Sequence, residues 1–364
     1  MLRDLTIQNY RCFDNFHMDG LEQVNLFVGN NNSGKTSLLE AIYLLSNSDK
    51  EEALIETIDN RTDYFLTDNT FFYSIKHLFF GHKLQEKVKA RISAEDGIPR
   101  QFTLEISTSI HGEHNPNLSM PYLDCYEQQK MIPSGVKELE SFIRLANRSS
   151  SINLENGGYI KINRQQRKEK YIQIEKKISN YVLVSVNKLF FEQVALMWDT
   201  IVLTSKEAKI IEALRIIEDN LERISFSSSS NANLIRLKLK NIENPIPLSS
   251  MGEGMYRILV LAMSLVSAEN GVLLVDEIET GLHYEAQTDM WRLILETAKE
   301  LNVQVFATTH SWDCIAAFQE ALSQVEDSSM GKLFRLDSKY GKLRAVEYNA
   351  EDLNIAVRNS IEVR

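Results

Sequence analysis

Hydrophobic positions along the chain follow two spacings that alternate through most of its length. Short apolar runs, typical of strands buried on both faces, occupy 24–28, 181–186, 271–276 and 303–307. Longer segments with apolar residues three or four positions apart, typical of amphipathic helices, occupy 37–45, 190–202, 256–267 and 284–302. Strands that alternate with helices predict an α/β fold with a mainly parallel sheet, whose ligands bind at the carboxyl ends of the strands.

The first and middle parts of the chain have different patterns. Apolar and polar residues alternate through 5–18, which predicts an antiparallel pair of half-buried strands and hence an antiparallel N-terminal β subdomain. Residues 51–85 are expected to be mainly helical, and strands are expected at 88–93 and 102–107. From 111 to 180 the sequence is more polar and less periodic. We expect a mostly helical insertion there, with a hairpin of two strands at 159–163 and 171–174. The predicted parts are an N-terminal lobe at 1–110, the insertion at 111–180 as a candidate partner-binding region, and a C-terminal lobe at 181–364.

A phosphate-binding loop joins the first buried strand to the helix at 37–45. Residues 29–36 match G-x-x-x-x-G-K-[ST] at every fixed position, with the required strand and helix on either side. Gly29 and Gly34 let the backbone turn several N–H groups toward a phosphate, and the helix start adds its positive end. Lys35 can reach the β and γ phosphates, and the Thr36 hydroxyl can ligate Mg²⁺. We therefore expect nucleotide contacts from Gly29, Asn30, Asn31, Asn32, Ser33, Gly34, Lys35, Thr36 and Ser37.

Acidic and histidine residues follow two later strands and complete a candidate ATPase site. Asp276 ends one apolar run, where it can hold Mg²⁺ together with Thr36, and the adjacent Glu277 can orient the attacking water. His310 follows the next strand at the same edge of the sheet and can hydrogen-bond the γ-phosphate. The predicted catalytic residues are therefore Lys35, Glu277 and His310, and the predicted metal ligands are Thr36 and Asp276.

A second phosphate cradle is predicted just before the helix at 256–267. Ser250, Gly252 and Glu253 lie there, and backbone N–H groups at a helix start can bind a phosphate. One subunit has no obvious need of two cradles. In a head-to-tail dimer, however, this segment of one copy closes over the phosphate loop of the other. The sequence therefore predicts a homodimer, or a higher oligomer, that forms on ATP.

Composition and charge narrow the function classes. A net charge of −10 argues against a generally basic nucleic-acid coat, although a local basic face can still bind DNA. No apolar run approaches the roughly 18 residues needed to cross a bilayer. Three cysteines without C-x-x-C spacing indicate reduced thiols, so we expect a cytoplasmic protein without membrane contact. The candidate DNA contacts, for which a solvated charged face is the alternative, are Lys161, Arg164, Arg167, Lys168, Lys170, Arg236, Lys238 and Lys240.

The order of the motifs GNNNSGKT, LSSMGEG, VLLVDE, ETGLH and TTH resembles the ABC-type ATPase heads of the RecF/SMC/OLD group, and IQNYRCF at 7–13 is similar to the start of that group. The resemblance implies an ABC-type head that binds ATP and Mg²⁺, with Ser250, Gly252 and Glu253 in the signature motif, 279–283 as the D-loop and His310 as the switch histidine. It also implies that Arg11 approaches the nucleotide, while a surface arginine is the alternative. The reading S-M-G-E in place of the S-G-G-Q of transporters favours the RecF-like branch. We expect no TOPRIM nuclease, because the stretch after His310 is too short for one.

Three functions remain open from the sequence. The first, implied by resemblance to stand-alone OLD-like ATPases, is a Mg²⁺-dependent ATPase that controls an operon-encoded effector protein in bacterial antiphage defence. The second is a RecF-like DNA-binding clamp in repair. The third is a nucleotide-locked scaffold with little turnover that releases a bound partner, with 111–180 as its binding surface.

Overall fold

The computed structural model describes residues 1–48, 50–67, 70–82, 87–94, 100–110, 139–145, 151–154, 159–163, 180–184, 191–229, 232–339 and 342–364. Its centre is a six-stranded sheet, in which all neighbouring pairs are parallel except the last. The strand order is β11 (Tyr181–Val184), β15 (Val272–Val275), β16 (Gln304–Thr308), β3 (Val24–Val28), β17 (Gly331–Lys339) and β18 (Lys342–Tyr348). The mainly parallel sheet that the apolar runs predict is confirmed.

Alternate residues of the central strands enter two separate hydrophobic cores. On β3, Leu26 and Val28 belong to one core, and Phe27 belongs to the other. Phe27 stacks on Phe306 of β16, with the ring centroids 6.2 Å apart. Because apolar side chains cover both faces of the sheet, these strands are apolar at nearly every position and appear in the sequence as continuous runs.

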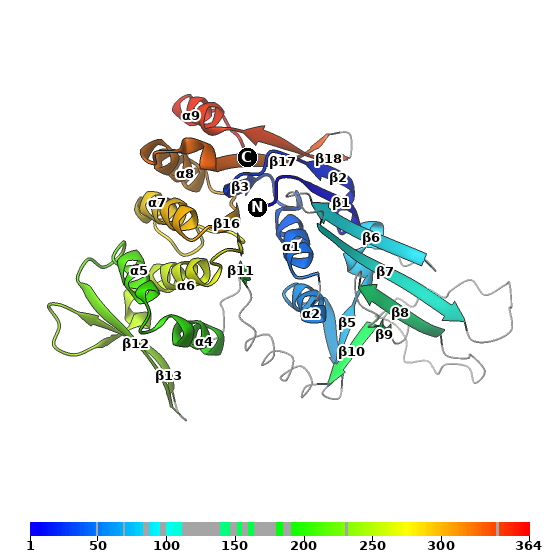
Figure 1. The fold of residues 1–364 in the computed structure, drawn as a ribbon, viewed down its shortest axis with the longest axis horizontal. Coiled ribbons are helices and arrows are strands. Elements are labelled where there is room, and N and C mark those ends of the chain that lie inside the picture. Colours follow the sequence, from blue (N-terminus) through cyan, green and yellow to red (C-terminus); the bar gives the residue numbers. More distant parts are fainter. Residues whose placement is uncertain are drawn as a thin grey trace.

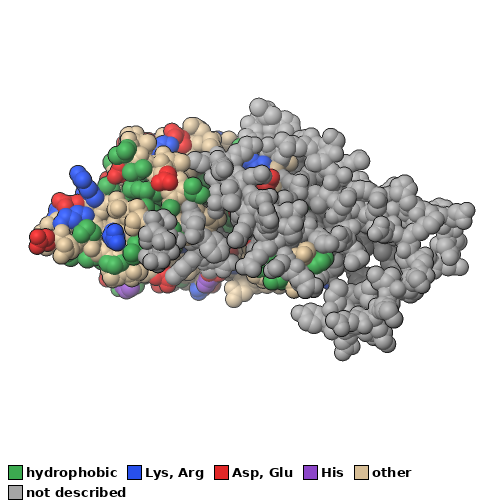
Figure 2. Space-filling view, turned by 90° about the horizontal axis from the view of Figure 1, so that it is seen from below, with side chains coloured by type: hydrophobic (Ala, Val, Ile, Leu, Met, Phe, Trp, Pro, Cys, Tyr) green, Lys and Arg blue, Asp and Glu red, His purple; other side chains and the backbone are tan. Residues whose placement is uncertain are grey.

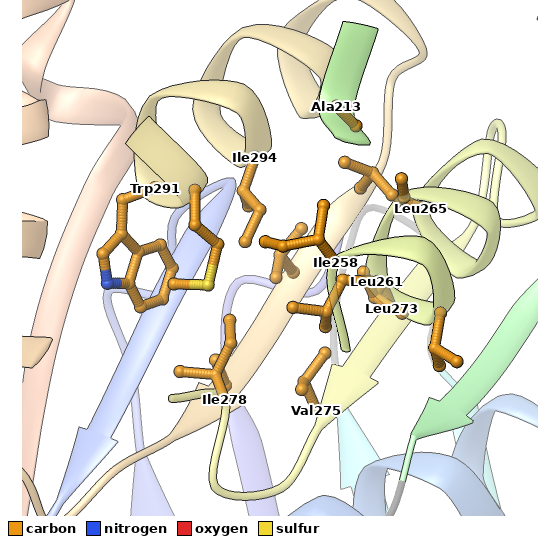
Figure 3. Close-up of a cluster of buried hydrophobic side chains, with 14 of the residues drawn as sticks. Ala213, Ile258, Leu261, Leu265, Leu273, Val275, Ile278, Trp291 and Ile294 are labelled. Atoms are coloured by element: carbon orange, nitrogen blue, oxygen red, sulfur yellow. The ribbon is translucent and has the colours of Figure 1, made fainter. Parts of the chain in front are cut away.

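Helices cover one face of the central sheet and enclose the larger core (Figure 1). Ile258, Leu261 and Leu265 of α6 point into this core toward β15 and α7 (Figure 3). Thr204 and Ser311 cap α5 and α8 by accepting hydrogen bonds from backbone N–H groups, as their positions before the helices predict. The helices are α4 (Phe191–Ile201), α5 (Ser205–Leu214), α6 (Glu253–Ser267), α7 (Tyr284–Glu300), α8 (Trp312–Gln324) and α9 (Ala350–Arg358).

The opposite face carries α1 (Lys35–Ser46), α2 (Glu51–Asp59) and an antiparallel sheet, which together enclose the second core (Figure 1). The predicted N-terminal antiparallel subdomain is therefore confirmed, and it is larger than the strand pair that the alternation at 5–18 indicated. Its strand order is β2 (Phe13–Met18), β1 (Leu5–Tyr10), β6 (Lys87–Ala94), β7 (Arg100–Ile110), β8 (Leu139–Leu145) and β9 (Ser151–Leu154).

The stretch between α2 and β6 differs from the sequence prediction. Residues 51–85 are not mainly helical: after α2 the chain forms β4 (Tyr64–Thr67), β5 (Thr70–Ser74) and two 3₁₀ turns, Lys76–Leu78 and Phe80–His82. Phe71 and Tyr73 are buried at alternate positions of β5, which suits a strand better than a helix. Of the insertion at 111–180, the described residues include the strands β8, β9 and β10 (Tyr159–Asn163), so the strand expected at 159–163 is confirmed, while most of the stretch expected to be mostly helical lies outside the described residues. β10 pairs with β5 and β8 pairs with β7.

A smaller antiparallel sheet lies beside α5 and α6. Its strands are β12 (Leu221–Ser229), β13 (Ala232–Leu239) and β14 (Ile246–Pro247), and two further 3₁₀ turns occur at Leu248–Met251 and Ser328–Met330. β12 continues through Ser225 and 227–229, because each of these serines pairs with a residue of β13. Among the described helices, none combines the length and the apolar content that crossing a membrane requires.

Candidate nucleotide-binding and catalytic site

The phosphate loop leaves β3 at Gly29 and enters α1 after Gly34. Both glycines have positive φ, at 145° and 94°, and Asn32 between them also lies in the left-handed region. A Cβ on Gly29 would lie 2.5 Å from the carbonyl oxygen of Leu336, and one on Gly34 would lie 2.8 Å from the Cys12 sulfur. Only glycine fits these two places, so the loop conformation depends on them. The result is a turn that presents backbone N–H groups at the start of α1.

Lys35 and Thr36, the first two residues of α1, lie at the mouth of this loop. The Lys35 ammonium donates hydrogen bonds to the carbonyl oxygens of Gly29 at 2.7 Å and Asn30 at 3.1 Å, which folds the side chain back over the loop. Partial burial lowers the pKa of Lys35, and the carboxylates of Asp276 and Glu277 oppose this shift. A triphosphate in the loop would replace the two carbonyl acceptors with stronger, anionic ones.

The Asp276 carboxylate connects the loop to two other segments. It accepts a hydrogen bond from the Thr36 hydroxyl at 2.9 Å and another from the Thr308 hydroxyl at 2.5 Å. Thr308 ends β16, the strand between β3 and β15, so its side chain bridges the two halves of the site. A hydroxyl beside a carboxylate at the end of a phosphate loop is the oxygen-only set that Mg²⁺ prefers, and the donors present therefore fit this ion.

Glu277 follows Asp276 and turns out of the sheet with a positive φ of 45°. Its backbone N–H donates to the Thr308 hydroxyl oxygen at 2.9 Å, and its carboxylate lies 3.8 Å from Nδ1 of His310. Glu279 approaches the same ring nitrogen at 4.0 Å and accepts a hydrogen bond from the His310 backbone at 3.4 Å. The predicted catalytic groups Lys35, Glu277 and His310 thus meet at one edge of the central sheet.

The predicted second cradle lies on another element, at the start of α6. Ser250 and Gly252 are exposed, and the Ser250 hydroxyl donates to the carbonyl oxygen of Pro247 at 2.6 Å within its own 3₁₀ turn. Gly252 has a φ of 84° and precedes Glu253, the first residue of α6. Glu253 packs against Gly281, where an added Cβ would lie 2.9 Å from its Cγ. The segment predicted as the signature motif is therefore in contact, within one chain, with the segment predicted as the D-loop.

Arg11 is not a surface arginine, because its side chain is only 8% exposed. Its Nε lies 2.7 Å from the Glu40 carboxylate and its Nη1 lies 3.4 Å from that of Asp63. Arg61 contacts the other oxygen of Glu40 at 2.7 Å and donates to the Ser37 hydroxyl at 3.2 Å. Arg11 thus belongs to a buried charge network that borders α1 at Ser37, and its approach to a nucleotide stays a prediction.

Sequence reasoning missed two residues of this site. Thr308 was noted only as part of the segment before His310, although a hydroxyl at the end of a buried strand is a signal for a polar contact. Arg257 of α6 is 8% exposed, and its guanidinium donates to backbone carbonyl groups at the end of β15. The sequence could have indicated this role, because Arg257 is a charged residue near the start of a strongly apolar helix, and a buried charge requires a partner inside the protein.

A phosphate loop, a hydroxyl–carboxylate pair suited to Mg²⁺ and an adjacent glutamate, all at the carboxyl edge of a parallel sheet, are the features of a P-loop nucleotide hydrolase. The fold of the chain is similar to that of the Smc head domain of Pyrococcus furiosus, with a TM-score of 0.53 at 11% identity, over 99% of both chains. An Smc head bound to the C-terminal winged-helix domain of ScpA matches with a TM-score of 0.51 at 13% identity, over 97% and 99%.

Residues 1–315 match the AAA ATPase domain family, and the chain belongs to that family. It is 24% identical to an ATP/GTP phosphatase of Helicobacter pylori, with 93% of this chain and 94% of that protein covered. It is also 23% identical to the DNA replication and repair protein RecF of Streptococcus pyogenes, over 88% and 95%. The protein is thus an ATPase of the RecF/SMC type, as the order of its motifs implies.

Proposed function

We propose that the protein is a Mg²⁺-dependent ATPase in which two copies close over ATP, and that turnover controls a bound effector protein. The observation that carries the catalytic part is the 2.9 Å hydrogen bond between Thr36 and Asp276, with Glu277 next in the chain. It joins the phosphate loop to a carboxylate 240 positions away.

The residues divide the chemistry between them. Lys35 and the loop N–H groups bind the β and γ phosphates, and Thr36 with Asp276 would hold Mg²⁺, which neutralises phosphate charge when bound. Glu277 orients a water molecule toward the γ-phosphate and accepts its proton as the bond forms. His310, 3.8 Å from Glu277, donates a hydrogen bond to the γ-phosphate and so links Glu277 to the presence of that group.

In this proposal a second copy supplies the other phosphate cradle, because the signature segment is exposed and can dock on the phosphate loop of another copy. Ser250 and Gly252 are exposed at the start of α6, and the helix N-terminus there supplies N–H groups and a positive dipole end for a phosphate. Ser250 of the partner copy would exchange its bond to Pro247 for one to the γ-phosphate. Likeness of the fold to Smc heads supports this arrangement.

The variant Glu277→Gln tests the catalytic role. It keeps the shape of the side chain but removes the proton acceptor, so we expect turnover to fall by about 10²-fold or more. Bound ATP then persists, and light scattering after gel filtration with Mg²⁺ and ATP should show a dimer. Glu285→Gln, an exposed glutamate in the first turn of α7, is the matched control. Wild-type turnover in Glu277→Gln would refute the role of Glu277.

A second variant, Ser250→Arg, tests the dimer separately. A large side chain on the exposed cradle is expected to prevent the ATP-dependent dimer and its turnover while a fluorescent ATP analogue still binds the monomer. If the dimer forms normally in Ser250→Arg together with Glu277→Gln, the predicted head-to-tail contact is wrong, whatever the outcome for Glu277.

The effector and an antiphage role rest on the resemblance to stand-alone OLD-like ATPases. The fold can carry a protein partner, since the similar Smc head was solved with ScpA bound. The partner site in this proposal is the region 111–180, whose described strands β8 and β9 extend the antiparallel sheet. Co-expression with the neighbouring gene product should yield a complex that deletion of this region abolishes. A complex that requires bound nucleotide but is equally stable in wild type and Glu277→Gln would favour the nucleotide-locked scaffold with little turnover.

DNA binding is a second candidate, favoured by one surface of the structure. Arg236 and Lys238 alternate with buried residues along β13, and Lys240 follows the last strand residue at the same spacing, so the three basic residues share the outer face. Arg223 pairs opposite Lys238. Basic side chains gather at this end of the molecule among acidic and hydrophobic ones (Figure 2). Of the other candidate contacts, Lys161 lies in β10, and 164–170 fall outside the described residues.

A salt titration distinguishes DNA binding from a solvated charged face. Neutralising several phosphates makes affinity fall steeply with salt, and Arg236→Glu with Lys240→Glu should weaken binding and flatten that slope. Arg292→Glu, which reverses an exposed charge on α7, is the control. Absent or salt-independent binding by the wild-type protein would remove this candidate.

A further inference from the structure

Arg257 is an unusual residue for its position. It lies in the first half of α6, which begins directly after the exposed signature segment and is otherwise buried among apolar side chains. Ile258, one position further, points into the hydrophobic core (Figure 3). A guanidinium placed here loses water, and such a placement persists only where the protein supplies other acceptors.

The acceptors are three consecutive backbone carbonyl groups at the end of β15. Arg257 Nη2 donates to the oxygen of Asp276 at 3.0 Å and of Glu277 at 2.7 Å, and Nε donates to that of Ile278 at 3.4 Å. The planar, forked guanidinium can satisfy several acceptors at once, which a lysine cannot. Arg257 therefore holds the segment from which the Glu277 side chain projects.

The N–H groups of the same segment are held from the other side. The N–H of Asp276 donates to the oxygen of Val184 on β11 at 2.9 Å, and the N–H of Ile278 donates to that of Thr308 on β16 at 3.0 Å. Glu277 lies between them with a positive φ, a conformation that costs a non-glycine residue of the order of 1 kcal/mol or more and needs surrounding support. The sheet and Arg257 together fix this turn.

A second contact ties the start of α6 to the same loop further along. Glu253 packs on Gly281, and a Cβ on Gly254 would lie 3.1 Å from the Gly281 carbonyl oxygen. Helix α6 thus touches the loop after β15 at two places about one helical turn apart. A helix that is rigid over this distance cannot shift at its first residue without moving Arg257 and the carbonyl groups it holds.

We propose that Arg257 is a positioning residue that couples the signature segment to Glu277. When a phosphate or the second copy docks on Ser250 and Gly252, α6 moves as a unit, and its guanidinium sets the orientation of the 276–278 peptides and hence of the Glu277 carboxylate. This inference rests on the proposed function, because it needs Glu277 to act on the attacking water. Through Arg257, docking on the signature segment would affect hydrolysis at Glu277 of the same chain.

The test compares Arg257→Met and Arg257→Lys with wild type, each with and without Glu277→Gln. A misplacement of about 1 Å at a catalytic group can cost about 10²-fold, so we expect kcat of Arg257→Met to fall by that order while KM and the affinity for a fluorescent ATP analogue change by less than about threefold. The kcat of Arg257→Lys, whose ammonium is a single donor group, should lie between that of wild type and that of Arg257→Met. In the Glu277→Gln background, Arg257→Met should lower kcat by less than about a further threefold, because the effects of residues that act through one another are not additive.

Arg215→Met is the matched control, because Arg215 also donates to a backbone carbonyl group, that of Leu221 at 3.0 Å, which belongs to β12 and not to the 276–278 segment. Wild-type kcat in Arg257→Met, or an equal loss with and without Glu277→Gln, would overturn the proposal. If Arg257→Met does not fold, Arg257→Lys decides by the same criteria. Wild-type turnover in Glu277→Gln alone would instead refute the proposed function, so the two failures are distinguishable.

Discussion

Thr308→Val perturbs the point at which the two halves of the site meet. Thr308 is fully buried, donates to the Asp276 carboxylate at 2.5 Å and accepts from the Glu277 N–H at 2.9 Å. Valine has nearly the same shape but can make neither bond. A hydrogen bond to a charged group contributes about 1.5–3 kcal/mol, and a buried donor left unpaired costs about 1–3 kcal/mol, so we take about 3 kcal/mol in all.

Two measurements follow from this value. For 364 residues the unfolding entropy is about 0.8 kcal/mol per kelvin, so the melting temperature should fall by about 4 °C. The carboxylate also loses the group that orients it, and loss of such a group typically weakens metal binding by about 10–100-fold. The Mg²⁺ concentration at half-maximal ATPase activity should therefore rise by that factor, and a calorimetric scan should show the destabilisation independently.

Thr309→Val is the matched control for this experiment. Thr309 is equally buried and also loses a hydrogen bond, but its hydroxyl accepts from the backbone of Ser311 at 3.0 Å, at the start of α8. We expect a lower melting temperature with an unchanged Mg²⁺ requirement. If Thr308→Val needs no more Mg²⁺ than wild type, or if both variants shift it alike, the bridging role of Thr308 is wrong.

Three further predictions concern Lys35, Gly29 and Cys314. Burial lowers the pKa of Lys35 from 10.5, so its charge, and with it ATP affinity measured by a fluorescent analogue, should begin to fall at a lower pH than for a free lysine; Lys35→Arg should lack this titration. Gly29→Ala forces a Cβ to 2.5 Å from a carbonyl oxygen, so ATP affinity should fall at least about tenfold. Gly81→Ala, with positive φ but open space, should bind normally. Burial raises the pKa of Cys314 to about 12, so iodoacetamide at pH 8 should label it only after denaturation, as mass spectrometry of its peptide would show.

The sequence predicts the parts of this fold that depend on local patterns. The strands at 24–28 and 272–275 are apolar at every position except Asn25 because both of their faces are buried, and the helices beside them have regular apolar stripes. The sequence also predicts the phosphate loop, because the backbone conformation of the loop requires glycine at fixed positions. All of these features depend on residues that are close together in the chain.

Features that depend on distant pairing were not predictable in the same way. The strands β8 and β9 lie in a polar, weakly periodic part of the sequence, and they extend the antiparallel sheet by pairing beyond β7. The role of Arg257 in the site was not predictable for the same reason. Its role is set by carbonyl groups about twenty positions away, so no local pattern distinguishes it from an arginine on a helix surface.

Strand order explains why the site residues can lie so far apart in the chain and still meet. β16 lies between β3 and β15, and its register places Thr308 opposite Phe27 and Ala307 opposite Val275. Thr308 is therefore level with the first residue after β15, which is Asp276. A shift of β16 by one residue would reverse its faces, moving Phe306 out of one core and Ala307 out of the other, and it would also separate Thr308 from Asp276. The apolar pattern that secures the two cores thus also fixes the register on which the hydroxyl–carboxylate contact depends.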